Sequence, residues 1–150
     1  MSIVNENTVI GLASDHAGYD IKQVVKAYLD ERGIAYKDFG TYDHASCDYP
    51  DFAHALAAAI EAGECYPGIA VCSTGNGINM ALNHHHDIRS ALCWAPELAM
   101  FARAHNNANV LVLPGNYVSP HIARGTVETF LATDFEGGRH ERRVNKIPVD

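Results

Sequence analysis

Residues 68–80 read GIAVCSTGNGINM, an apolar run that ends in a glycine turn. The run from Gly68 to Cys72 is typical of a strand that is buried on both faces of a sheet. The turn Gly75-Asn76-Gly77 then opens a helix, which we expect near residues 77–84. A buried strand followed by a turn and a helix is one β-α unit of a parallel sheet, because parallel strands need a crossover connection.

The same unit occurs on both sides of this stretch. Short apolar runs predict strands, and apolar residues at helical spacing predict the helices between them. We expect further strands near 8–14, 35–39, 89–93 and 110–114, and further helices near 19–32, 51–62, 96–104 and 119–132. Five such units predict a doubly wound α/β fold, with helices on both faces of a five-stranded parallel sheet.

Composition limits the domain organisation and the partners. A chain of 150 residues with 47% hydrophobic and 19% charged residues suits one globular domain over residues 1–150. Eleven basic against eighteen acidic side chains give a net charge of -7, which disfavours binding to nucleic acid and to membrane surfaces. The first ten residues show no export signal, and the apolar runs are too short to span a bilayer. Four scattered cysteines without a CxxC pair suit a reducing, cytoplasmic setting.

Parallel α/β sheets bind ligands beyond the carboxyl ends of their strands, where Cys72 stands. The N–H groups of Asn76, Gly77 and Ile78 in the first helical turn are expected to face an anion there. The same N–H groups should favour the thiolate form of Cys72, which would make this residue a base or nucleophile. The alternative is that Cys72 is a small buried hydrophobe at a strand end. A GxGxxG fingerprint is absent after the first predicted strand, which disfavours a dinucleotide cofactor.

Nine histidines are many for this length. His16 and His105 stand at the ends of predicted elements, where each is either a general acid or base or a structural residue. The run His84 to His86, with Asp87, resembles a metal-binding tract. Its consecutive side chains diverge and no second ligand motif accompanies it, so we interpret it as a surface run and expect no metal site. His44, His54 and His121 are read as surface or packing residues.

The C-terminal residues 139–146 concentrate basic side chains in an acidic protein. Arg139, His140, Arg142 and Arg143 follow the pair Gly137-Gly138. This cluster is either a solvated end of the chain or a site that captures a phosphate monoester, because guanidinium groups match phosphate oxygens in pairs. The second interpretation predicts a small phosphorylated ligand.

Six motifs together give the chain a recognisable pattern. The motifs are SDHAG (14–18), DFGT (38–41), DYPD (48–51), CSTGNG (72–77), HNNANVL (105–111) and EGGRH (136–140). Together and in this order they resemble the ribose-5-phosphate isomerase B family, which also includes galactose-6-phosphate and allose-6-phosphate isomerases. The resemblance runs from about residue 8 to residue 147. It implies a Rossmann-like three-layer αβα sandwich, and a homodimer or pair of dimers with active sites at the subunit boundary.

The resemblance also implies a reaction, the interconversion of ribose 5-phosphate and ribulose 5-phosphate without metal or cofactor. In this interpretation Cys72 is the catalytic base, Thr74 assists proton transfer and His105 opens the sugar ring. The remaining positions are matched to substrate binding: Asp15 and His16 line the sugar, Gly75, Asn76, Gly77 and Ile78 with Asn106 hold its oxygens, and Arg139, His140 and Arg143 hold the phosphate. Removal of a proton next to a carbonyl needs a base and an anion hole of this kind.

Several positions depart from the family pattern. Ser73 replaces a usual glycine, and Asn116 stands where many relatives place an arginine that contacts phosphate. Trp94 and Pro96 also lie where relatives differ. These departures leave open an isomerase for allose or galactose 6-phosphate, a tetrose phosphate or an unphosphorylated sugar. A catalytically silent protein that binds a sugar phosphate is a further alternative.

Overall fold

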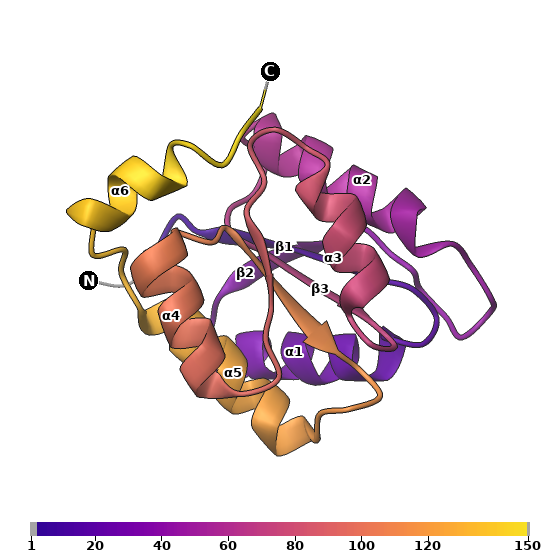
Figure 1. Cartoon of the computed structure of the whole chain (residues 1–150). Helices are drawn as coiled ribbons and strands as arrows, with labels where there is room; N and C mark the ends of the chain where they lie inside the picture. Colours follow the sequence, from indigo (N-terminus) through magenta and orange to yellow (C-terminus); the bar gives the residue numbers. More distant parts are fainter. Residues whose placement is uncertain (1–2, 150) are drawn as a thin grey trace.

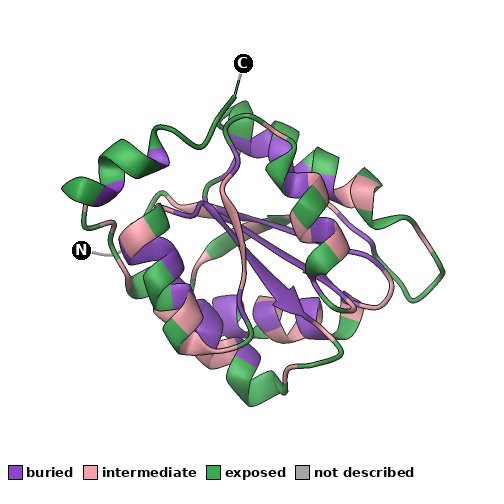
Figure 2. Cartoon of the chain, viewed as in Figure 1, coloured by how far each residue is buried: buried purple, intermediate pink, exposed green. Residues whose placement is uncertain are grey.

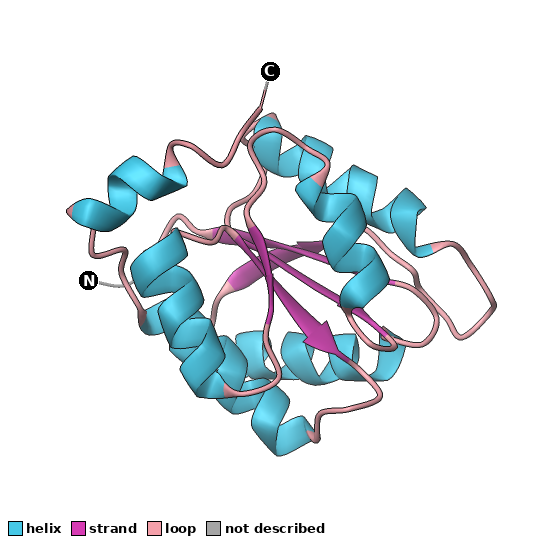
Figure 3. Cartoon of the chain, viewed as in Figure 1, coloured by secondary structure: helices cyan, strands magenta, loops and turns pink. Residues whose placement is uncertain are grey.

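The computed structural model describes residues 3–149 and contains one five-stranded parallel sheet (Figure 3). The strand order is β2-β1-β3-β5-β4. The strands are β1 (Val9–Ser14), β2 (Ala35–Asp38), β3 (Gly68–Cys72), β4 (Ser90–Leu92) and β5 (Val110–Pro114). The order reverses between β1 and β3, since successive strands are added on opposite sides of this pair. The predicted doubly wound α/β sandwich is therefore confirmed.

Six helices surround the sheet (Figure 1). They are α1 (Tyr19–Glu31), α2 (Tyr49–Glu61), α3 (Asn76–Asn83), α4 (Pro96–Asn106), α5 (Pro120–Ala132) and α6 (Arg139–Val144). Helices α2 and α3 cover one face of the sheet, and α1, α4 and α5 cover the other. This arrangement gives the three layers that alternating strands and helices predict.

Alternation along the strands builds a separate core on each face (Figure 2). Successive side chains of a strand point to opposite faces. In β3, Ile69 and Val71 face the helices α1, α4 and α5, whereas Ala70 and Cys72 pack towards α2 and α3. All five residues of β3 and all five of β5 are buried, which explains why their sequences are continuously apolar.

Three helices differ from the sequence prediction, two in their bounds and one in its existence. Helix α2 begins at Tyr49, with Pro50 in its first turn, where a proline lacks only an N–H that has no helical partner. Helix α4 continues to Asn106 and ends where Asn107 adopts a left-handed conformation, so His105 belongs to its last turn. Helix α6 was not predicted. Its six residues are mostly charged and bury only His140 and Val144, too few to give a helical apolar pattern.

The sequence predicted no membrane span and no disulfide framework. Within residues 3–149, no helix is long and apolar enough to cross a membrane. All four cysteines are free thiols, three of them buried.

Candidate active site

The carboxyl ends of β1 and β3 carry the first group of predicted site residues. Asp15 and His16 follow β1, and Cys72 closes β3 next to it. Gly75 has φ 77°, and a Cβ atom there would lie 2.4 Å from Cδ1 of Leu92. Gly77 lies against the ring of Tyr49, 2.6 Å from where its Cβ would be. Glycine is therefore required at both positions for the loop to turn back over Cys72.

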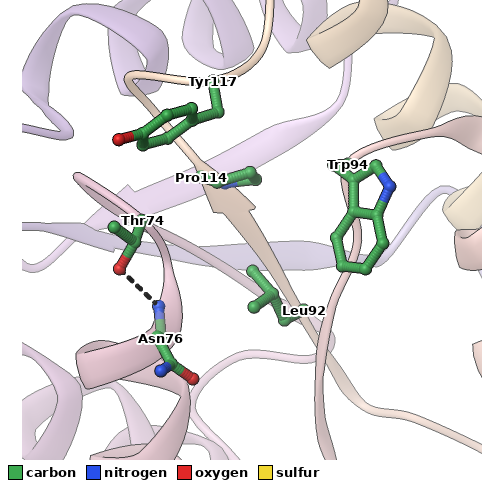
Figure 4. Close-up of a pocket in the computed structure, with 6 residues that line it drawn as sticks. All are labelled: Thr74, Asn76, Leu92, Trp94, Pro114 and Tyr117. Carbon is green, nitrogen blue, oxygen red and sulfur yellow. Dashed lines mark hydrogen bonds between the residues drawn. The ribbon is translucent and has the colours of Figure 1, made fainter.

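The loop brings backbone N–H groups to the sulfur of Cys72. The Sγ atom accepts hydrogen bonds from the N–H groups of Gly75, Gly77 and Ile78. The sequence predicted that the N–H groups of Gly77 and Ile78 would face a bound anion, and that role stays a prediction. Asn76 was also expected to contribute its N–H, but this group donates to Oγ1 of Thr74 at 3.2 Å instead (Figure 4). Gly75 takes its place because its left-handed conformation turns its N–H towards the sulfur.

The pKa of Cys72 departs from its expected direction. Burial raises the pKa of this thiol, since only 4% of the residue is exposed. The three N–H groups lower the pKa, as the sequence predicted, but the loss of hydration outweighs them, and the charge of Asp15 raises the pKa further. The prediction that the loop favours thiolate in the free chain is therefore wrong. The loop supplies partners for a thiolate without making it the dominant form.

Asp15 and His16 have distinct local roles. Asp15 is buried, and its Oδ1 accepts a hydrogen bond from the N–H of Gly18 at 2.9 Å, which closes the turn into α1. The N–H of Cys47 donates to Nδ1 of His16 at 3.2 Å. Because Nδ1 accepts a hydrogen bond, neutral His16 carries its proton on Nε2, which makes Nε2 a donor. His16 can thus donate a hydrogen bond to a substrate oxygen.

A cavity of about 470 Å³ opens beside this loop (Figure 4). Its polar side carries the hydroxyl of Thr74 and the side chain of Asn76, and its apolar side includes the exposed rings of Trp94 and Tyr117. Leu92 and Pro114 complete the lining. Its size suits a small sugar, and a mixed lining of this kind is typical of small-molecule sites.

The second group of predicted residues lies at the opposite edge of the sheet (Figure 1). His105 and Asn106 end α4, just before β5 begins, and α6 carries Arg139, His140 and Arg143. The rings of His105 and His140 stack, with centroids 4.3 Å apart and an interplanar angle of 10°. Burial lowers the pKa of His140, and the nearby His105 and Arg139 lower it further. Arg139 and Arg143 are exposed.

One chain therefore does not bring the two groups together. Cys72 pairs with Pro114 at the end of β5, whereas His105 precedes the start of that strand at Val110. Val110 and Pro114 are four residue steps apart along β5, which corresponds to about 13 Å at the usual rise per residue. In Figure 1, α6 lies at the upper left, and the arrowhead of β5 points away from it. The candidate site is divided between two edges of the same sheet.

The sequence analysis missed two residues that support these groups. Lys22 is only 1% exposed, and its Nζ donates to Oδ1 of Asp38 at 2.8 Å and to the backbone oxygen of Thr41. Lys22 thereby holds the segment after β2, which leads to Cys47, the hydrogen-bond partner of His16. The signal was its place on the buried face of α1, three residues before Val25. The other is Glu136, which faces both His105 and His140.

Metal-ligating side chains gather at a place that the sequence did not indicate. Among residues 3–149, one group of three could hold a metal ion, namely His105, Glu136 and His140, whose ligand atoms lie within 4.8 Å of one another. The run of histidines at 84–86 forms no such group. His54, predicted to be a surface or packing residue, is exposed, and its Nδ1 lies 2.7 Å from Nε2 of His85.

Comparisons with known proteins agree with this architecture. The family described as Ribose/Galactose Isomerase matches residues 10–147. Ribose-5-phosphate isomerase B of Escherichia coli K12 is 38% identical over 138 residues, which cover 92% of this chain and 93% of that protein. A crystal structure of a ribose 5-phosphate isomerase from Thermotoga maritima is 48% identical, with a TM-score of 0.93, and covers 95% of this chain and 99% of that one.

A third relative carries a ligand. Ribose-5-phosphate isomerase B from Mycoplasma genitalium, solved with bound ribulose 5-phosphate, is 37% identical with a TM-score of 0.89, and 95% of each chain is covered. The sequence resemblance, the matched length and the fold all lead to one conclusion: this chain belongs to the ribose/galactose isomerase family.

Proposed function

We propose that this chain is a metal-independent aldose–ketose isomerase that interconverts ribose 5-phosphate and ribulose 5-phosphate. The observation that carries the proposal is the sulfur of Cys72, which receives three backbone N–H groups at a strand end beside a sugar-sized cavity. Relatives named ribose-5-phosphate isomerase B, one of them solved with ribulose 5-phosphate, support the choice of substrate.

The reaction moves a carbonyl group between adjacent carbons. The thiolate of Cys72 removes the C2 proton of the open-chain aldose. The C–H electrons form the C1–C2 double bond, and the electrons of the C1 carbonyl move onto its oxygen. The C2 hydroxyl then gives its proton to the C1 oxygen, and the electrons of its O–H bond form the C2 carbonyl. The electrons of the C1–C2 double bond take back the proton on sulfur at C1, which leaves a hydroxyl at C1 and a ketone at C2 and restores the thiolate. No electron leaves the sugar, so the chemistry needs a base and a stabilised enediolate but no oxidant.

Thr74 and the loop serve the enediolate. Oγ1 of Thr74 accepts the N–H of Asn76, so its own proton is free to donate to a substrate oxygen. The donors of the loop are fixed by the fold before substrate binds, and preorganised donors in a site shielded from water stabilise developing charge most effectively. We propose that the N–H groups of Gly75, Gly77 and Ile78 stabilise the thiolate first and become available to the enediolate once the sulfur holds the proton. Asn76 contributes its side chain, which lines the cavity, and Asp15 with His16 contacts the sugar oxygens.

The second edge supplies ring opening and phosphate binding. We propose that His105 transfers the proton that opens the furanose ring, that Asn106 contacts substrate oxygens, and that Arg139, His140 and Arg143 hold the phosphate. Because this edge lies about 13 Å of strand length from Cys72, the complete site needs a second copy of the chain. In a symmetric dimer, His105 of one copy faces Cys72 of the other, and two equal sites result.

Exposed apolar side chains support such a dimer. Met100 and Phe101 are exposed on α4 beside His105, and Trp94 and Tyr117 are exposed beside the Cys72 loop. Apolar surface near both half-sites is typical of an interface. We propose a homodimer, or a pair of dimers, in the cytoplasm, where the free thiols stay reduced.

The test uses protein treated with a chelator and assayed in deuterated water. Isomerisation of ribose 5-phosphate should persist without added metal, with deuterium incorporated at the reacting carbon. Cys72→Ala should lose at least about a hundredfold in kcat/KM. Cys65→Ala removes a buried thiol that lies outside the loop, before the start of β3, and is the matched control. Full activity of Cys72→Ala would refute the base assignment, and binding without deuterium exchange would identify a silent binding protein.

A related isomerase for another sugar is the second candidate. The observation that favours it is the neutral Asn116, whose side chain is engaged by Ser73 and therefore offers no charge to a phosphate. A panel of ribose 5-phosphate, allose 6-phosphate, galactose 6-phosphate, a tetrose phosphate and unphosphorylated sugars, ranked by kcat/KM, decides between the two.

A further inference from the structure

The side chains of His105, Glu136 and His140 converge near the amino ends of the strands. Nε2 of His105 lies 3.9 Å from Oε2 of Glu136, and Nε2 of His140 lies 3.6 Å from its Oε1. The segment is held in place by the N–H of Glu136, which donates to the backbone oxygen of Ala104 at 3.0 Å. Two imidazole nitrogens and a carboxylate therefore face one another from two different elements.

The buried member of this group lacks a partner. His140 is 8% exposed, and its Nε2 makes no hydrogen bond to any residue that the structure describes. A buried polar atom left without a partner costs about 1–3 kcal/mol, so such atoms usually mark the place of a ligand. The Nε2 atom is aimed at Glu136, which shows where that ligand sits.

We propose that His105, Glu136 and His140 form a binding site for a divalent transition-metal cation of the Zn²⁺ class, and that the bound cation inhibits the enzyme. Two histidine nitrogens and one carboxylate oxygen, with a fourth position open, are a ligand set that Zn²⁺ accepts. With metal–ligand bonds of about 2.0–2.1 Å, neighbouring ligand atoms of a tetrahedron are about 3.4 Å apart. The distances of 3.6 and 3.9 Å run to different oxygens of Glu136, and the three ligand atoms lie within 4.8 Å of one another, so the widest separation must shorten by at most about 1.4 Å.

Two side chains supply the necessary movement. Glu136 is 58% exposed and free to approach the nitrogens. His105 is 36% exposed, and its ring tilts out of the stack with His140 so that the two Nε2 atoms converge on the cation. His140 is held by its burial and stays in place.

Inhibition rests on the proposed function. If His105 opens the sugar ring and His140 binds phosphate, a cation on their Nε2 atoms removes both groups from the reaction at once. Sugar phosphate and cation then compete for the same nitrogens. The isomerisation itself still needs no metal, so the site is a place of control and not of catalysis.

The binding test needs no substrate. Metal-free protein is titrated with Co²⁺, which reports a tetrahedral nitrogen–oxygen site by its visible absorption. The parent chain should bind one Co²⁺ per chain, and Glu136→Gln should weaken binding by at least about tenfold. Glu141→Gln removes the same charge from an exposed position of α6 and should leave binding unchanged. The double variant His84→Gln/His86→Gln tests the histidine run and should also bind normally.

The activity test uses the same variants with Zn²⁺ as the probe. Zn²⁺ should inhibit the parent enzyme, excess chelator should restore its activity, and added ribose 5-phosphate should raise the Zn²⁺ concentration needed. The Zn²⁺ concentration that halves activity should rise at least about tenfold in Glu136→Gln, measured against that variant's own metal-free rate.

Equal Co²⁺ affinity of Glu136→Gln and the parent, or loss of binding only in the double histidine variant, would overturn the site. If the cation binds at the site but does not inhibit an active enzyme, the proposed inhibition is overturned. Tight Co²⁺ binding by a chain that isomerises no sugar would refute the proposed function and leave the site standing.

Discussion

The side-chain amide of Asn116 donates a hydrogen bond to Oγ of Ser73 at 2.7 Å. Two backbone bonds run beside it, from the N–H of Asn116 to the oxygen of Ser73 at 3.0 Å and from the N–H of Gly115 to the oxygen of Cys72 at 2.8 Å. Both residues are expected from the sequence to depart from the family pattern, and the structure shows that their side chains are partners. The turn after β5 is thereby joined to the loop that surrounds Cys72.

This partnership predicts coupling between two substitutions. Ser73→Ala and Asn116→Ala should each lower the free energy of unfolding slightly, and the double variant should lose less than their sum, with a coupling of about 0.5–1 kcal/mol. Urea denaturation measures the three values. Ser73→Ala combined with Asn145→Ala, which follows the last residue of α6 at the other edge of the sheet, should be additive. Additivity in the Ser73/Asn116 pair would show that the hydrogen bond contributes nothing.

The division of the site predicts complementation between inactive variants. Cys72→Ala and His105→Asn should each be nearly inactive alone. After denaturation and refolding of an equal mixture, half of the dimers are mixed, and each mixed dimer holds one intact site. Because a symmetric dimer has two equivalent sites, about a quarter of the parent activity should return. No recovery, with mixed dimers present by native mass spectrometry, would place both groups in one chain's site.

The raised pKa of Cys72 predicts the shape of the pH profile. The thiolate is the active form, so kcat/KM should increase as pH rises through the pKa of the free enzyme's thiol. Burial places that pKa above the ordinary value of 9.0, so the increase should continue beyond pH 9. Alkylation rates should differ between the thiols. Cys47, which is half-buried, should be alkylated faster than Cys72, which is buried. A profile that is flat from pH 7 to 9 would contradict the assignment.

Lys22 predicts a large effect on stability. Lys22→Ala removes one partner of a buried ion pair and leaves Asp38 with the longer contact to Lys26, 3.3 Å, and the N–H of Gly40. The free energy of unfolding should fall by about 3–5 kcal/mol, the usual cost of breaking such a pair. Lys37→Ala, whose pair with Glu64 is exposed, is the control and should cost less than about 1 kcal/mol. Equal losses in calorimetry or urea denaturation would refute the structural role of Lys22.

The order of elements and the loop around Cys72 could be predicted from the sequence because both depend on neighbouring residues. The run Gly68–Cys72 is apolar throughout since it is buried on both faces, and Gly75 and Gly77 mark a turn that side chains would block. Helix α6 could not be predicted in the same way, because its stability depends on packing His140 and Val144 against the rest of the chain.

The sequence by itself determined the five β-α units, the glycine loop over Cys72 and the residues to which we assign the chemistry. Only the tertiary structure decided which of them meet. Parallel strands place Cys72 at one edge of the sheet, and an antiparallel helix returns His105 to the other, so their distance is fixed by strand length and not by spacing in the chain. The same folding decided the protonation of Cys72 and the approach of Glu136 to two histidines, because burial and long-range contacts are properties of the packed chain.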